Sequence, residues 1–160
     1  MAPVLDEARA RIILESLLRN VYRSFDFREE STVYDKLATS VAGDLLADVY
    51  LQSRRSLSIE QAGGAQARIQ EVEVLEATAG DPRDGRLAYD VRARWTASGR
   101  VGHWGHIHQR KNLYEADLRL EAVNGSWKLV GLELLDEKRI DAGAGQSAGG
   151  SPAANTANQP

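Results

Sequence analysis

The chemistry-bearing residues of the chain concentrate in one segment, GHWGHIHQR at positions 102–110, which holds all three histidines. On an extended strand successive side chains alternate, so His106 and His108 share one face, whereas His103 points to the other. Two imidazoles on one face can ligate a metal ion, and either one can serve as a general acid or base. The segment therefore offers His106 and His108 as candidate catalytic residues.

A metal site at these histidines lacks the other ligands that it would need. Structural zinc sites almost always have four protein ligands, the chain contains no cysteine, and the next carboxylate along the segment, Glu115, is distant. The chain also has no glycine-rich phosphate loop, no serine elbow and no acidic metal cluster. We therefore expect no metal and no cofactor, and a structural role for the histidines is the preferred interpretation.

Aromatic side chains form a second group of candidates. A pocket with aromatic walls and a few polar groups suits a small apolar ligand. The same rings can equally fill a hydrophobic core, which is the preferred interpretation. The candidates for the pocket lining are Tyr34, Tyr50, Trp95, Trp104 and Tyr114.

A third candidate is the polar face of one predicted strand. Asp90, Arg92 and Arg94 alternate there with apolar residues, so their shared face is expected to be exposed to solvent. A row of arginines can also bind an acidic partner. The face is therefore either a solvated surface or a docking surface.

The composition restricts the class of protein. The chain has 160 residues and a net charge of −3, which argues against a nucleic-acid partner because such proteins usually carry a basic field. No run approaches the ~20 apolar residues of a membrane span, and the charged N-terminal segment is unlike an export signal. The excess of Arg over Lys, with abundant Ala and Gly, is typical of a GC-rich bacterial genome.

Two kinds of periodicity divide the chain. Apolar residues at helical spacing predict helices over Leu5–Ser24, Glu29–Thr39 and Gly43–Glu60. From position 68 the period changes to two, which predicts strands over Arg68–Ala77 and Arg86–Ala97.

The second half of the chain is expected to fold as a meander. Ser98-Gly99-Arg100 is interpreted as a hairpin turn, and Val101–Val123 as one bent strand or two nearly collinear ones. Asn124-Gly125 predicts a type I′ hairpin that places Trp127 opposite Ala122.

The folded domain is expected to span residues 1–140. The segment 141–160, DAGAGQSAGGSPAANTANQP, has no aromatic residue and no Leu, Ile or Val. Such a composition cannot bury enough apolar surface to offset the entropy of ordering the chain. We therefore predict that it is a disordered tail or a linker.

Three helices followed by an antiparallel meander make an α+β layout. The long amphipathic first helix, the very long central strand and the closing hairpin AVNGSWKLVGLELLDE resemble the nuclear transport factor two-like superfamily, also described as a cystatin-like cone. The resemblance covers about Leu5–Ile140. It implies a curved sheet of about four strands wrapped around the first helix. It also implies that enzymatic members carry an Asp or a His–Asp pair in the mouth of the cone, a role to which no Asp of this chain aligns.

The cone fold hosts enzymes and non-catalytic domains alike, so it does not select a function. The preferred hypothesis is a non-catalytic binding or assembly module. It would be a domain of a larger bacterial protein, with a periplasmic, membrane-anchored parent favoured over a cytoplasmic one. The alternative is an isomerase, dehydratase or cyclase with His106 or His108 as the acid–base residue. The partner would be an unknown protein or a small apolar ligand, and a homodimer formed through the sheet is compatible with either.

Overall fold

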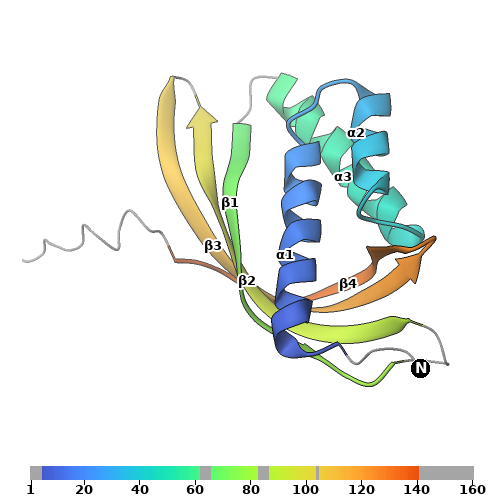
Figure 1. The fold of residues 1–160 in the computed structure, drawn as a ribbon. Helices are drawn as coiled ribbons and strands as arrows, with labels where there is room; N and C mark the ends of the chain where they lie inside the picture. Colours follow the sequence, from blue (N-terminus) through green and yellow to red (C-terminus); the bar gives the residue numbers. More distant parts are fainter. Residues whose placement is uncertain (1–4, 62–65, 83–86, 104, 141–160) are drawn as a thin grey trace, which may run out of the picture.

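The structure, a computed structural model, describes residues 5–61, 66–82, 87–103 and 105–140 (Figure 1). Its helices are α1 (Glu7–Ser24), α2 (Glu30–Ala38) and α3 (Asp44–Gln61), and its strands are β1 (Gln66–Ala79), β2 (Ala88–His103), β3 (His106–Val123) and β4 (Ser126–Arg139). The strands form one antiparallel sheet in the order β1-β2-β3-β4. The predicted class, three helices packed on a curved antiparallel sheet of four strands, is confirmed. Trp104 and the tail predicted over 141–160 lie outside the described residues.

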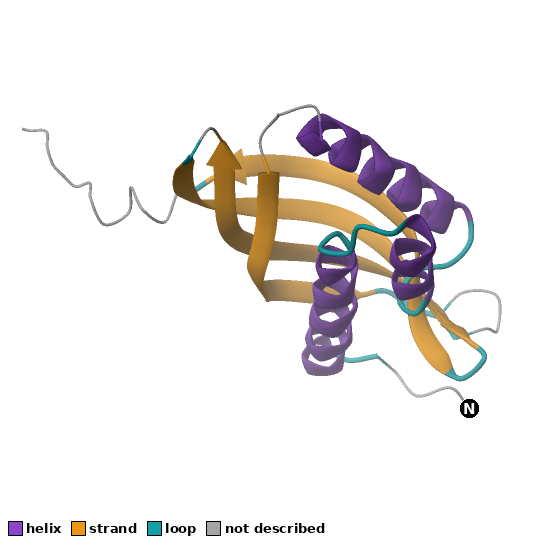
Figure 2. Ribbon diagram, turned by 90° about the horizontal axis from the view of Figure 1, so that it is seen from above, coloured by secondary structure: helices purple, strands orange, loops and turns teal. Residues whose placement is uncertain are grey.

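The first helix follows directly from its sequence. The Asp6 carboxylate accepts a hydrogen bond from the Arg9 N–H at 2.8 Å and so caps the first turn. Ala10, Leu14 and Leu18 recur at helical spacing and are buried. The helix lies inside the bend of the sheet, with α2 and α3 beside it (Figures 1 and 2).

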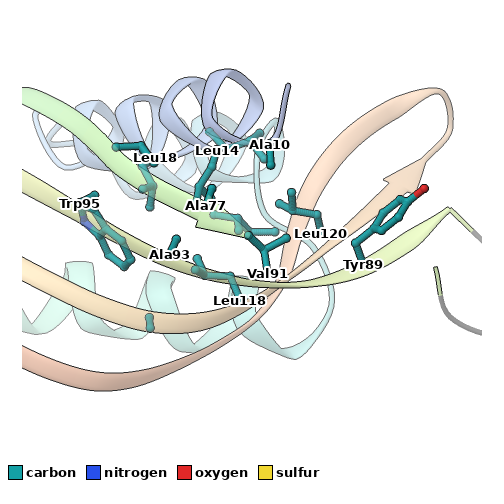
Figure 3. Close-up of a cluster of buried hydrophobic side chains, with 14 of the residues drawn as sticks. Ala10, Leu14, Leu18, Ala77, Tyr89, Val91, Ala93, Trp95, Leu118 and Leu120 are labelled. Atoms are coloured by element: carbon teal, nitrogen blue, oxygen red, sulfur yellow. The ribbon is translucent and has the colours of Figure 1, made fainter. Parts of the chain in front are cut away.

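The core fills the space between α1 and the inner face of the sheet (Figure 3). Val91 and Ala93 of β2 lie opposite Leu118 and Ala116 of β3 and are buried with them. Residues that lie opposite each other project to the same side of a sheet, so this face is continuously apolar. Burying one such Val or Leu side chain stabilises the fold by about 1.5–3 kcal/mol relative to leaving it exposed.

The predicted closing hairpin is confirmed. Asn124 and Gly125 have φ values of 51° and 83°, which the tight two-residue turn requires. Ala122 lies opposite Trp127, as expected. The Trp127 ring is half-buried against Tyr89, with ring centroids 5.9 Å apart.

The hairpin predicted at Ser98-Gly99-Arg100 is wrong. These residues continue β2, which runs on to His103, and the turn to β3 contains Gly105 with φ 83°. The long segment predicted from Val101 therefore divides between two strands. Gly99 serves a different purpose: a Cβ at this position would come within 2.8 Å of the Ile69 Cα on β1. The glycine permits a close approach of two strands rather than a turn.

Candidate functional site

An open groove lies between α1 and α3, over the inner face of β2, β3 and β4. It has a volume of about 330 Å³. Helix α1 lines it with Leu18, Val21 and Tyr22, and the residue that caps the end of α1, Phe25, also lines it. Helix α3 contributes Asp48, Val49 and Gln52, and the strands contribute Trp95, Tyr114, Leu132 and Leu134. Apolar side chains dominate this lining, so the groove is the candidate binding site.

Two aromatic rings form the floor of the groove. Trp95 of β2 lies opposite Tyr114 of β3, and their rings stack with centroids 5.5 Å apart and planes 25° apart. The Trp95 indole N–H donates a hydrogen bond to the Tyr22 hydroxyl at 3.3 Å. This bond connects α1 to the sheet and satisfies the one polar group of a nearly buried indole.

The tyrosine hydroxyls of the groove stay protonated at neutral pH. Burial raises the pKa of Tyr22 to about 12 and also raises the pKa of Tyr114, and the Glu137 carboxylate contributes to both shifts. The Tyr114 hydroxyl accepts a hydrogen bond from the Asn112 amide at 3.1 Å. The Tyr22 hydroxyl accepts from Trp95 and keeps its own proton, for which no acceptor is found among the described residues. It can therefore donate to a group that enters the groove.

The structure separates the aromatic candidates for the pocket. Trp95 and Tyr114 line the groove. Tyr34 and Tyr50 are absent from its described lining and contact each other between α2 and α3, with ring centroids 5.5 Å apart and nearly perpendicular planes. The Tyr50 hydroxyl donates a hydrogen bond to the Glu30 carboxylate at 3.2 Å. Tyr50 therefore connects α3 to α2 and is not available as part of the groove wall. Trp104, the fifth candidate, lies outside the described residues.

The candidate catalytic histidines lie away from the groove lining. His106 and His108 begin β3, and both side chains are exposed. Their rings are 6.4 Å apart and nearly parallel, as expected for alternate residues of a strand. The part of the chain that the structure describes contains no group of three or more His, Cys, Asp or Glu side chains that could hold a metal ion. The side chain of His103 is outside that part.

Several residues of the groove are missing from the sequence-based candidates. Tyr22 belongs to the apolar stripe of the first predicted helix, and Leu132 and Leu134 belong to the last predicted strand. Their apolar periodicity predicts that they face inward. The same pattern does not distinguish a residue that is covered by a helix from one that borders an open groove.

The outer face of the sheet carries paired charges. Each arginine of the predicted row is bound to a carboxylate on a neighbouring strand. The cross-strand pairs are Arg92–Asp117, Arg94–Glu76 and Arg119–Asp90. The hydrogen bond from Arg92 lowers the pKa of Asp117. The charges of Arg92 and Arg94 are thus already compensated, which argues against a row of arginines that awaits an acidic partner.

Fold and groove together define an α+β domain with an open apolar groove on the inner face of its sheet. No protein-family model and no curated protein matches the chain. Among solved structures, the fold is similar to that of the intermembrane-space region of the chloroplast protein ARC6, with a TM-score of 0.58, 16% identity and coverage of 83% of this chain and 98% of that one. At this identity the similarity concerns the fold. None of the described helices is both long and apolar enough to cross a membrane.

Proposed function

We propose that the chain is a non-catalytic binding module whose groove takes an apolar segment of a partner protein. The observation that supports the proposal is the exposure of large apolar side chains at the groove. Leu132 and Leu134 line it and are 42% and 47% exposed. Exposed apolar side chains that gather at a concave surface are typical of interaction sites.

A polypeptide segment suits the groove better than a diffusible small molecule. The groove is open to solvent, whereas pockets for small molecules usually bury most of the ligand surface. The apolar walls can take side chains of the segment, and the Tyr22 hydroxyl can donate to one of its peptide carbonyls. A small apolar ligand would leave that donor without a partner.

The negative charge at the groove indicates which charge the bound segment carries. Asp48 lines the groove and is exposed, and Glu137 is close enough to Tyr22 and Tyr114 to raise their pKa values. Two carboxylates beside an apolar surface favour a positively charged neighbour. We infer that the segment carries a basic residue next to its apolar ones.

The enzymatic alternative requires a histidine beside a carboxylate inside a cavity. No histidine belongs to the described lining of the groove, because His106 and His108 lie exposed at the start of β3. The polar groups that do line it are neutral phenols, an amide and one carboxylate. The binding module is therefore the function that we propose.

The proposal also covers the superfamily of the domain and its location in the cell. The order of helices and strands and the bend of the sheet support the nuclear transport factor two-like assignment. We also propose that the domain belongs to a larger bacterial protein, outside the cytoplasmic membrane. The segment 141–160, whose composition is typical of a linker, supports attachment to further sequence.

The groove can be tested with the uncharged dye Nile red, whose fluorescence rises in an apolar site. We expect the wild-type chain to enhance the fluorescence and Val49→Asp to abolish most of the enhancement, because Val49 lines the groove. The matched control is Leu51→Asp on the same helix, since Leu51 is 55% exposed and is not part of the described groove lining. Equal fluorescence with Val49→Asp and the wild type would exclude the groove as the binding site.

The basic residue can be tested by displacement of the dye with two blocked tetrapeptides, LVLK and LVLE. We expect the lysine peptide to displace Nile red at lower concentration than the glutamate peptide. The preference should shrink in Asp48→Asn, which keeps the shape of the rim and removes its charge. Equal displacement by the two peptides would contradict the inferred charge of the segment.

A further inference from the structure

A row of polar side chains on β3 continues the floor of the groove. Strands β2 and β3 pair without a register shift from Tyr114 to the turn between them, so alternate residues of β3 stay on one side of the sheet. The members of the row on the side of Tyr114 are Asn112, Arg110, His108 and His106. The Asn112 amide donates to the Tyr114 hydroxyl and the two imidazole rings stack, which agrees with a shared face. The row thus leads from the groove toward the β2–β3 turn.

The row is open to solvent. His106, His108 and Arg110 are exposed, and the β2–β3 end of the sheet reaches past the helices (Figure 2). Strand β4 ends at Arg139, opposite Asn112, so it does not extend along the rest of the row. The residues of β2 that lie opposite Asn112, Arg110 and His108 are small or apolar: Ala97, Gly99 and Val101. A ligand in the groove can therefore extend over the row without displacing a helix.

This end of the sheet is positively charged, although the net charge of the chain is −3. The segment 98–114 contains Arg100, Arg110, Lys111 and all three histidines, but no Asp or Glu. Arg110 forms no ion pair within the described part of the chain. Its guanidinium presents N–H donors in a geometry that matches a carboxylate, and an imidazole can donate a hydrogen bond beside it. The row therefore favours a carboxylate as its ligand.

We propose that the segment bound in the groove continues along β3 and carries an acidic residue that binds Arg110 and His108. The inference rests on the proposed function and adds the chemistry of a second part of the same ligand. Tyr114 and Arg110 are four positions apart on one strand, which spans roughly 13 Å at about 3.3 Å per residue. An extended segment covers this distance in the same number of residues. The acidic residue therefore lies about four positions from the apolar ones.

The groove and the row differ in the sign of their charge. Asp48 lines the groove and Glu137 lies opposite Tyr114, whereas the row beyond them carries Arg110 and the two exposed imidazoles. A segment with a basic residue beside its apolar ones and an acidic residue farther along is attracted at both places. A uniformly anionic ligand, such as a membrane surface, would meet Asp48 and Glu137 with like charge. The charge pattern therefore favours a polypeptide that carries both signs.

The test is displacement of Nile red from the full chain, at low ionic strength, by two pairs of blocked heptapeptides. The pair LVLSGSE and LVLSGSQ places the variable residue after the apolar ones. The pair ESGSLVL and QSGSLVL places it before them, because a segment can enter the groove in either direction. In one direction we expect the glutamate peptide to displace the dye at about threefold lower concentration than its glutamine counterpart. Non-specific attraction would give the opposite order, since the chain is negatively charged.

Two variants of adjacent residues locate the binding site of the glutamate. Arg110→Gln removes the guanidinium from the row, so it should abolish the preference for the glutamate peptide. The matched control is Lys111→Gln, which removes the same charge from the next position of β3. Lys111 lies opposite Ser98 and projects to the other face of the sheet, so this variant should keep the preference.

Three results would overturn the inference: no difference between glutamate and glutamine peptides in either direction, a preference that Arg110→Gln retains, or an equal loss of the preference in Lys111→Gln. The failure of the proposed function looks different. If Val49→Asp keeps the Nile red signal of the wild type, the groove is not the binding site and both proposals fall. If Val49→Asp abolishes the signal and the paired peptides displace the dye equally, the groove remains the binding site and only the acidic residue is excluded.

Discussion

Tyr22 joins the helical layer to the aromatic floor of the groove. Its hydroxyl accepts the only proton that the Trp95 indole can donate. Because the phenol is largely buried and Glu137 is nearby, the ionised form is disfavoured in the folded chain. One residue therefore couples the attachment of α1 to the protonation state of a phenol.

We predict that Tyr22 makes the fold sensitive to alkaline pH. Its pKa rises from 10.0 to about 12 on folding. Its contribution to stability is complete below pH 10 and is lost as the pH rises toward 12. By linkage the loss is about 2–3 kcal/mol. In urea unfolding at pH values on either side of this range, Tyr22→Phe should lose less free energy of unfolding than the wild type.

The control for this prediction is Tyr34→Phe, because Tyr34 is 44% exposed. That variant should show the same alkaline loss as the wild type. If Tyr22→Phe and the wild type lose the same free energy of unfolding across the range, the phenol of Tyr22 is not the responsible group.

The sequence alone identifies only some of the residues that line the groove. Trp95 and Tyr114 could be placed on the inner face because strand alternation is strict. Whether they border an open groove depends on the distance between α1 and α3, which no local pattern encodes. Tyr22 shows this limit most clearly, since its position in the apolar stripe of α1 looks the same as that of Leu14, which is fully buried and is not part of the described groove lining.

Strands β1 and β2 approach each other most closely at Gly99. An added Cβ there would overlap the Arg68 carbonyl oxygen and lie within 2.8 Å of the Arg68 carbonyl carbon and the Ile69 Cα. These are backbone atoms, so relief requires the two strands to separate.

We predict that Gly99→Ala destabilises the chain by about 3 kcal/mol, since overpacking against backbone cannot be relieved by a side-chain rotation. Thermal and urea unfolding would measure the loss. Gly102→Ala on the same strand is the matched control, because its nearest new contacts would lie at 3.9 Å and 4.0 Å. Equal stability of the two variants would contradict the close approach.

Two glycines of the sheet, Gly125 and Gly99, show when the role of a glycine can be predicted from the sequence. Asn124-Gly125 was predictable as a turn because the requirement for positive φ is local and both residues meet it. Gly99 was misinterpreted because its reason is the backbone of Arg68, which is distant in the sequence. A glycine flanked by serine and arginine suits either use, and only the tertiary neighbour decides.

At the scale of the whole molecule, the chain divides into a packed domain and a segment of different composition. We predict that removing residues 141–160 leaves the melting temperature unchanged, because the segment lacks the apolar side chains that a core needs. Differential scanning calorimetry of the two lengths would measure this. A drop of several degrees would show that the segment contributes to the fold.

A shorter chain that ends after Leu132 is the control for the truncation. It removes the part of β4 that pairs with residues 112–117 of β3. It should unfold at a clearly lower temperature, which would establish that the assay detects the loss of sheet contacts.

The α+β class could be predicted because helices and strands occupy separate halves of the sequence. The bend of the sheet was expected from the resemblance to a cone, and the structure has it. The position of α3 could not be inferred, because its apolar stripe fits any apolar surface of the sheet. That position creates the groove, so the candidate site was less predictable than the fold.

The separation of helices and strands also affects how the chain is made. Helix α1 leaves the ribosome first, yet Leu14 and Leu18 are buried against strands that are synthesised later. At about 5–20 residues per second, the interval between the end of α1 and the end of β4 is on the order of ten seconds. During that time the nascent helix exposes its apolar stripe to solvent. Apolar surface that is exposed before folding is complete is prone to aggregation, so the stripe that organises the finished core is a hazard while the sheet is still incomplete.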